Sequence, residues 1–215
     1  MLPKIISKKT IKFLATLAVA VSATAVASAE DARGKQLYTN CLACHGPDGY
    51  GNQLLNAPAI AGLSEKYIVN QLQKFHDGIR GGDVRDAAGL QMRPMAMTVP
   101  TEEDKTAVAK YVASLPVKKQ EKTLEGGDPE KGKILYTTCA ACHGQSAEGN
   151  DLMNSPSLQG QHDWYLASQL KHFKEGIRGA NPQDISGAQM RPMAMMLTDE
   201  QAIKDVIAYI ESLSE

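Results

Sequence analysis

Apolar residues recur at helical spacing in two segments of the first half of the chain, and the same spacing returns in the second half. The first segment covers about residues 65–77 and is ended by Gly78. The second begins near Thr101, which forms a pattern resembling a capping box with Asp104. A shorter helix is predicted over residues 33–41, and no segment shows convincing strand alternation. The pattern therefore predicts an all-α fold with three helices in each half. The apolar faces consist of Ile68, Leu72 and Phe75, then Val108, Tyr111, Val112 and Leu115, and in the second half Leu166, Leu170 and Phe173, then Val206, Tyr209, Ile210 and Leu213.

The two halves are copies of one another. Residues 31–116 and 129–214 align at a constant offset of 98 without a gap and share 38 identities in 86 positions, which indicates an internal duplication. Between them lies a polar segment rich in Lys and Glu that ends in Gly126-Gly127, a composition typical of a linker. We therefore expect two domains, 30–116 and 129–215, joined by a short polar linker, 117–128.

The first 29 residues have the pattern of a signal peptide. Four lysines precede a short run of apolar and small residues over positions 13–26, and Ala27-Ser28-Ala29 forms an A-x-A cleavage site. This apolar run is shorter than a typical membrane-spanning helix, so it predicts a membrane span less strongly than it predicts a signal peptide. We expect a mature chain that begins at Glu30 and functions in the periplasm. An uncleaved membrane anchor is the alternative, and the mass of the mature protein distinguishes the two.

Removal of this leader makes the chain acidic. The full sequence has 23 basic and 24 acidic residues, and the leader contains four lysines and no acid. The mature chain would have 19 basic residues against 24 acidic ones, a net charge of −5. Such a charge argues against nucleic acid as a partner.

All four cysteines lie in two C-x-x-C-H motifs. Cys41 and Cys44 precede His45, and 98 residues later the same spacing places Cys139 and Cys142 before His143. In this motif the two thiols can form thioethers to one porphyrin, while the histidine is placed to ligate the iron. The sequence therefore predicts two covalently bound haem c groups. Each copy is small for a purely apolar core, and a haem would supply the missing apolar volume.

Other uses of these cysteines fit less well. A zinc site would need a second pair of ligands at zinc-finger spacing within each copy, and neither copy has one. A thioredoxin-like dithiol normally follows a strand, and nothing strand-like precedes either motif. Two structural disulfides remain the simplest alternative in an exported chain.

A methionine-rich heptapeptide is a candidate source of the sixth iron ligand. The sequence Q-M-R-P-M-A-M occupies residues 91–97 and returns unchanged at 189–195, although the copies match at fewer than half of their positions. A thioether opposite histidine raises the haem potential, as suits electron transfer. We expect each heptapeptide to form a loop in which one methionine is a ligand and two are packing residues. No histidine outside the motifs recurs at equivalent positions, and a Cu(I) site would leave the haem motifs unexplained.

The order of these features resembles a class I cytochrome c, and its tandem duplication behind a signal peptide is similar to the di-haem cytochrome c4 group. The resemblance covers essentially residues 30–215 and is most specific at the two C-x-x-C-H motifs and the two methionine segments. In that family the axial methionine stands seven residues before an aliphatic residue that leads into the last helix. The resemblance therefore selects Met92 and Met190. It also implies that backbone carbonyls at Pro58 and Pro156 orient the two histidine rings.

Four arginines also recur in both copies. These residues, Arg80, Arg93, Arg178 and Arg191, could pair with haem propionates, although solvated side chains are the simpler interpretation. We expect the recurring tyrosines at positions 38, 67, 136 and 165 to pack in the cores rather than act as redox intermediates.

The predicted function is that of an electron carrier and not an enzyme. Through the resemblance, the donor would be a membrane quinol-oxidising complex and the acceptor a terminal oxidase. One alternative is a cytochrome subunit of a larger oxidoreductase, such as a flavoprotein sulfide dehydrogenase. Another is a haem enzyme, such as a peroxidase or a thiosulfate-oxidising cytochrome, with one labile axial position. Two identical methionine segments argue against such a specialised haem.

Overall fold

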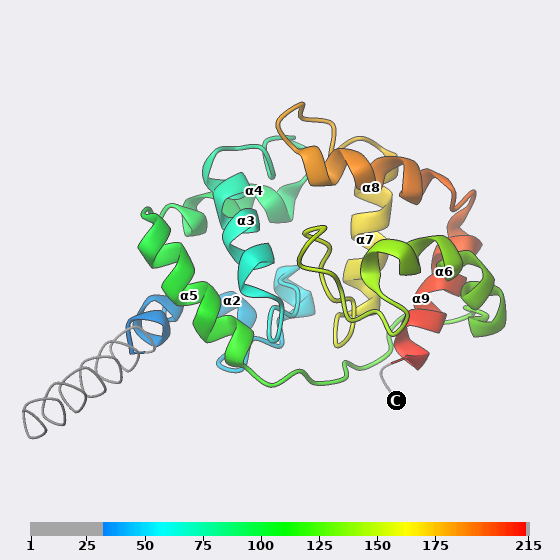
Figure 1. Ribbon diagram of the computed structural model, residues 1–215, viewed down its shortest axis with the longest axis horizontal. Helices are drawn as coiled ribbons and strands as arrows, with labels where there is room; N and C mark the ends of the chain where they lie inside the picture. The colour runs from blue at the N-terminus through cyan, green and yellow to red at the C-terminus, as the bar shows by residue number, and fades with distance from the viewer. Residues whose placement is uncertain (1–31, 214–215) are drawn as a thin grey trace, which may run out of the picture.

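The computed structural model describes residues 32–213 and is built from helices and loops (Figure 1). Within this range no strand is present, and the only extended pairings are two isolated bridges, Asn52 with Ala57 and Asn150 with Ser155. The predicted all-α fold is confirmed. The leader assigned to residues 1–29 lies outside the described residues. None of the helices within 32–213 is long and apolar enough to cross a membrane.

The two halves contain corresponding α-helices in the same order, although the 3-10 helix η1 of the first half has no counterpart in the second. In the first half, residues 32–38 are helical and are followed by α2 (Leu42–His45), η1 (Gln53–Leu55), α3 (Glu65–His76), α4 (Ala87–Ala96) and α5 (Glu102–Ser114). In the second half, the order is α6 (Pro129–His143), α7 (Asp163–Lys174), α8 (Ile185–Met195) and α9 (Glu200–Ser212). The predicted first helix is interrupted by a turn in the first half, whereas in the second half it runs without a break through the C-x-x-C-H motif as α6.

The helix ends follow the expected local chemistry. The Thr101 hydroxyl accepts a hydrogen bond of 3.1 Å from the Asp104 backbone N–H and so caps α5. The helix α3 stops before Gly78, whose φ of 70° lies in the left-handed region that favours glycine. Both boundaries are as predicted.

The methionine segments are helices, and the expectation of a loop there is wrong. Asp86 caps α4 by accepting from the Gly89 N–H at 2.9 Å, and Asp184 caps α8 by accepting from the Gly187 N–H at 3.0 Å. Each helix contains a proline, Pro94 or Pro192, near its C-terminal end. A proline there removes only one hydrogen bond near the helix end, so the helix survives a residue that usually predicts its absence.

The first and last helices of each domain cross at a glycine. A Cβ atom on Gly34 would lie 2.2 Å from the Ala107 carbonyl oxygen, and one on Gly132 would lie 1.9 Å from that of Asp205. Only glycine permits such an approach. Beside each crossing two tyrosine rings pack together, Tyr38 with Tyr111 and Tyr136 with Tyr209, as expected for the core at Tyr38 and Tyr136. The apolar cores lie next to these crossings.

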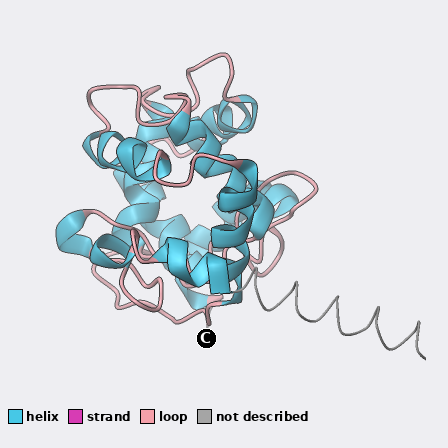
Figure 2. Ribbon diagram, turned by 90° about the vertical axis from the view of Figure 1, so that its left-hand side faces the viewer, coloured by secondary structure: helices cyan, strands magenta, loops and turns pink. Residues whose placement is uncertain are grey.

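The two domains lie side by side, with α3 and α7 at the centre of the molecule and the linker running along one edge from α5 to α6 (Figure 1). The view turned by 90° likewise shows helices arranged around a common centre (Figure 2). The second half of the linker is anchored to the second domain, because the Asp163 carboxylate accepts hydrogen bonds from the backbone N–H groups of Thr123 and Leu124. This arrangement turns the C-x-x-C-H motif of each domain toward the same interior space.

Candidate functional site

A continuous cavity of about 310 Å³ reaches from one domain into the other. Packed protein interiors contain few voids larger than a water molecule, so a space of this size and apolar character indicates a site for a large apolar group. Both C-x-x-C-H motifs and both methionine helices open into it. Its apolar walls include Ile68, Leu72, Phe75 and Val108 of the first domain and Leu166, Leu170, Phe173 and Val206 of the second.

The two histidines of the motifs are buried, and their surroundings favour the uncharged form of each ring. The Nδ1 atom of His45 lies 2.9 Å from the Pro58 carbonyl oxygen, and that of His143 lies 2.9 Å from the Pro156 oxygen. Burial lowers the pKa of both rings, and the carbonyl contacts oppose this shift without reversing it. A carbonyl can only accept, so Nδ1 carries the proton and Nε2 keeps a free lone pair. This is the tautomer that a metal ligand requires.

All four cysteines line the same cavity. Burial, with a smaller contribution from Cys44, raises the pKa of Cys41 to about 11. Burial also raises the pKa of Cys139. None of the four forms a disulfide, so the disulfide interpretation is not supported. Within the described part of the chain, no cluster of three or more His, Cys, Asp or Glu side chains could hold a separate metal ion.

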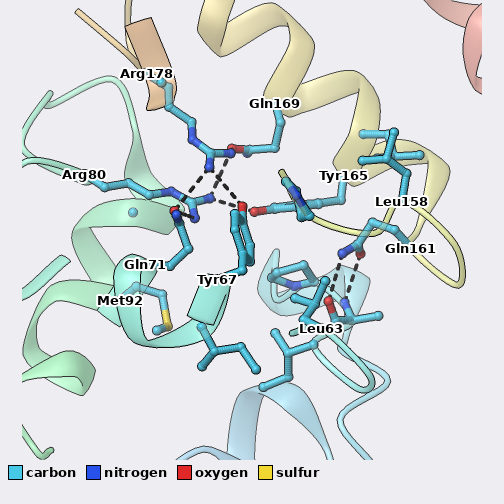
Figure 3. A pocket seen from close by; sticks show the side chains of 18 of the residues that line it. Leu63, Tyr67, Gln71, Arg80, Met92, Leu158, Gln161, Tyr165, Gln169 and Arg178 are labelled. Atoms are coloured by element: carbon cyan, nitrogen blue, oxygen red, sulfur yellow. Dashed lines mark hydrogen bonds between the residues drawn. The ribbon is translucent and has the colours of Figure 1, made fainter. Parts of the chain in front are cut away.

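The helices α4 and α8 divide their methionines between the cavity and the surface. Met92 and Met95 of α4 line the cavity, as do their counterparts Met190 and Met193. The third methionine of each set, Met97 or Met195, is more than half exposed and does not line it. The structure thus reduces the three candidate sulfurs of each domain to two (Figure 3 shows Met92).

A hydrogen-bonded network with approximate two-fold symmetry joins the two domains among the residues that line the cavity (Figure 3). Arg80 donates to the Tyr165 hydroxyl at 2.7 Å and to the Gln169 oxygen at 3.1 Å, both in the other domain. Arg178 donates in return to the Tyr67 hydroxyl at 3.1 Å and to the Gln71 oxygen at 3.2 Å. Within its own domain, Arg80 bonds Gln71 at 2.9 Å and Arg178 bonds Gln169 at 2.8 Å. The network therefore uses the same three residue types from each copy.

This network carries positive charge with only neutral hydrogen-bond acceptors. Burial acts to raise the pKa of Tyr67, but the guanidinium groups of Arg178 and Arg80 outweigh it and lower that pKa. The Nε atom of Arg80 is buried without a partner. Buried charges are normally paired, so carboxylates of a bound group, such as haem propionates, fit this site. The solvated interpretation is wrong for Arg80, which is 9% exposed.

Sequence reasoning missed the position of two of the tyrosines. Tyr67 and Tyr165 lie in the network between the domains, whereas Tyr38 and Tyr136 pack in the cores as expected. The signal was present in the alignment of the copies, since tyrosine, glutamine and arginine recur together at the constant offset.

Comparison with known proteins decides the nature of this site. A family model described as cytochrome c matches residues 32–116 and matches again over residues 129–214. The chain belongs to the cytochrome c family. Its two C-x-x-C-H motifs are accordingly two sites of covalent attachment for haem c, with Cys41 and Cys44 in the first and Cys139 and Cys142 in the second. The cavity, its thiols and its buried imidazoles fit that cofactor.

Relatives named cytochrome c4 match nearly the full length of this chain. The chain is 31% identical to cytochrome c4 of Azotobacter vinelandii over 96% of this chain and 99% of that protein. It is 34% identical to a thiosulfate dehydrogenase electron acceptor of Thiomonas intermedia, over 75% of this chain and 73% of the relative. The crystal structure of reduced cytochrome c4 from Pseudomonas stutzeri superimposes with a TM-score of 0.64 at 30% identity, covering 83% of this chain and 95% of that one. The resemblance to di-haem cytochrome c4 is confirmed. This cytochrome is an electron-transfer protein with two haems, and its partners are redox proteins.

Proposed function

We propose that the protein is a periplasmic carrier that passes single electrons between respiratory partners through two low-spin haems, each with one histidine and one methionine ligand. The haem iron supplies a one-electron couple between its ferrous and ferric states. The observation that best supports this proposal is the continuous cavity, which is lined by the C-x-x-C-H motif and the methionine helix of each domain.

The proposed ligands are assigned domain by domain. His45 and Met92 would ligate the first iron, and His143 and Met190 the second. The buried, Nδ1-protonated histidines support one side of this set. On the other side, two of the three methionines of each heptapeptide line the cavity. The family spacing favours Met92 and Met190 over Met95 and Met193.

The cellular setting is part of the same proposal. Residues 1–29 would be a cleaved signal peptide, so that the mature protein starts at Glu30 in the periplasm, where bacterial haem c is attached. The mature chain would form two cytochrome domains, 30–116 and 129–215, with the linker 117–128 between them. The donor would be a membrane quinol-oxidising complex and the acceptor a terminal oxidase, as the resemblance to cytochrome c4 implies.

Spectroelectrochemistry of Met92→Leu and Met190→Leu, made separately, tests the ligand assignment. Axial ligands set haem potentials over about 0.8 V, so each variant should lose one high-potential component by a shift on the order of 0.1 V or more. The oxidised far-red band of methionine-ligated iron should fall by half in each. Met97→Leu and Met195→Leu are matched controls, because these side chains lie outside the cavity. If Met95→Leu or Met193→Leu produces the loss instead, the assignment moves to those residues.

A second candidate function is that of an electron-accepting partner to a thiosulfate-oxidising enzyme. The observation in its favour is the relative from Thiomonas intermedia, which is named as such an acceptor. Stoichiometric co-purification with a dehydrogenase at native abundance, and reduction by it faster than by a quinol-oxidising complex, would favour this function. Ready binding of cyanide or CO by either haem would instead favour a haem enzyme, since that chemistry needs a labile axial position.

A further inference from the structure

One side chain of the second domain holds the backbone of the first domain beside His45. Gln161 lies in the loop that precedes α7 and reaches across the interface to Ala59 (Figure 3). Its side-chain oxygen accepts a hydrogen bond of 3.1 Å from the Ala59 N–H, and its side-chain nitrogen donates one of 2.8 Å to the Ala59 carbonyl. The amide orientation is fixed by chemistry, because a backbone N–H can only donate and a carbonyl can only accept.

The contact continues through a single peptide unit to the histidine. The N–H of Ala59 and the carbonyl of Pro58 belong to the same peptide bond, and that carbonyl lies 2.9 Å from His45 Nδ1. Two hydrogen bonds in series therefore connect the Gln161 oxygen to the imidazole ring. Hydrogen bonds in such chains polarise one another. An acceptor on the Ala59 N–H makes the Pro58 oxygen a better acceptor for the ring N–H.

Among residues 32–213, the second domain receives no equivalent hydrogen bond from the first. At the constant offset, Leu63 takes the place of Gln161 and Ser157 takes that of Ala59. A leucine side chain has no hydrogen-bonding atom, so it cannot polarise the peptide that follows Pro156. The asymmetry extends to the next position, since His162 Nε2 lies 2.7 Å from the Tyr50 carbonyl of the first domain and its counterpart is a serine.

The contact in the opposite direction is of another kind. Lys66 of the first domain donates at 2.8 Å to the Asp151 carbonyl of the second, but it is exposed. Lys66 therefore contacts the loop of the second domain at Asp151, and not at the peptide whose Pro156 carbonyl accepts from the His143 ring. The two domains thus treat each other's histidine loop differently.

We propose that Gln161 is a positioning residue through which the second domain tunes the haem of the first domain. This rests on His45 being the axial ligand of the first iron, as stated under the proposed function. A ring N–H that donates to a stronger acceptor makes the imidazole a stronger electron donor and favours ferric iron. Docking of the second domain therefore lowers the potential of the first haem, whereas docking of the first domain has no such effect on the second haem.

Replacement of Gln161 by methionine removes both hydrogen bonds to Ala59 at nearly constant size, together with the bond of 3.0 Å that the Gln161 oxygen accepts from the His162 N–H of its own domain. We expect the potential of the first haem to rise, because its histidine then donates to a weaker acceptor. The ferric-to-ferrous ratio at a fixed potential should change by about threefold. For a one-electron couple, in which a tenfold change equals about 59 mV, this corresponds to about 30 mV. The second haem should keep its potential. The NMR resonance of the His45 Nδ1–H proton in the reduced protein should shift toward the position typical of a weaker hydrogen bond.

Gln159→Met is the matched control for this substitution. Gln159 lies two residues away in the same loop, and its side chain donates at 2.6 Å to Ser146 of its own domain. It should leave the first haem and the His45 proton unchanged. Equal shifts of both haems in Gln161→Met, or no shift of either the potential or the proton, would overturn the proposal.

If Gln161→Met does not fold, the proposal is tested by the reverse substitution at the equivalent position of the first domain, Leu63→Gln. Leu63→Gln offers the missing acceptor to the peptide that follows Pro156, and it should lower the potential of the second haem while leaving the first in place. An unchanged second haem would count against the relay. Failure of the ligand assignment would be seen separately, in the spectrum of the unaltered protein, because the relay acts on the histidine side and requires no particular methionine.

Discussion

Lys74 of α3 crosses the domain interface to a carboxylate that also caps a helix of the other domain. Its Nζ atom lies 2.6 Å from Asp184 Oδ1, and the two side chains are 9% and 2% exposed. Lys74→Met would leave Asp184 buried without its cation, which typically costs about 3–5 kcal/mol. We expect the free energy of unfolding of the haem-loaded protein to fall by about 3 kcal/mol in guanidinium titrations.

Lys66→Met is the control for this variant, because Lys66 also bonds across the interface but is exposed. Its loss should cost less than about 1 kcal/mol. The double variant Lys74→Met with Asp184→Asn should recover part of the loss, since asparagine still caps a helix and no unpaired charge remains. Equal losses in Lys74→Met and Lys66→Met would show that burial of the pair does not govern its contribution.

The crossing of α6 with α9 depends on the absence of a side chain at position 132. A Cβ atom there would meet backbone of α9, which cannot move away as a flexible side chain could. Alanine is the better helix former by about 1 kcal/mol, so propensity alone predicts stabilisation by Gly132→Ala. Overpacking costs about 1–3 kcal/mol and acts against that gain. We expect the clash to outweigh the gain and to lower the unfolding midpoint of the second domain.

Thr137→Ala, on the exposed face of α6, serves as the comparison. Its hydroxyl bonds only the carbonyl of Lys133 one turn earlier, so the substitution should be close to neutral. If Gly132→Ala unfolds at a higher temperature than the unaltered protein, α6 and α9 can move apart at no cost in stability.

The helices that follow strong apolar periodicity could be predicted from the sequence, and the methionine helices could not. The helix α3 and its C-terminal end could be predicted from the apolar stripe of Ile68, Leu72 and Phe75 and from Gly78, which follows the helix. In α4 the signals conflict, because Gly89 and Pro94 are poor helix formers and the sulfurs are divided between cavity and surface. Capping by Asp86 stabilises that helix, but an aspartate before two alanines is a weak signal by itself.

At the scale of the whole molecule, the packing of one domain on the other was out of reach of sequence reasoning. Alignment of the copies compares equivalent positions and contains no information on how one copy contacts the other. The recurrence of Tyr67, Gln71 and Arg80 in the second copy was visible. Their exchange across a pseudo-two-fold axis follows only from the assembled structure.

That approximate symmetry is broken at a titratable position. Where Lys74 meets Asp184, the equivalent contact in the other half of the interface is His172 with Asp86. The His172 Nδ1 atom lies 3.8 Å from the Asp86 oxygen and has no hydrogen-bond partner. Burial lowers the pKa of His172, Asp86 and Glu175 oppose this shift, and the cations of Arg178 and Arg80 add to it. The folded protein therefore keeps this ring neutral to a lower pH than the unfolded chain does.

The sign of the pH dependence follows from this difference. Above the ordinary histidine pKa of about 6.5, both states are neutral and His172 has no pH-dependent effect on stability. As pH falls through that value the unfolded chain binds the proton first, so stability is lost until the pH reaches the lower pKa of the folded state. One proton changes the free energy of unfolding by at most about 1.4 kcal/mol per pH unit.

His172→Gln and His172→Lys together test this effect, measured as the difference in unfolding free energy from the unaltered protein between pH 5 and pH 8. Subtraction cancels the titration of every other group. Relative to the unaltered protein, both variants should gain stability as the pH falls below about 6.5. Only the lysine should add stability at pH 8 as well, because it recreates opposite Asp86 the ion pair that Lys74 forms with Asp184. A difference that stays constant over this range for His172→Gln would place the proton elsewhere.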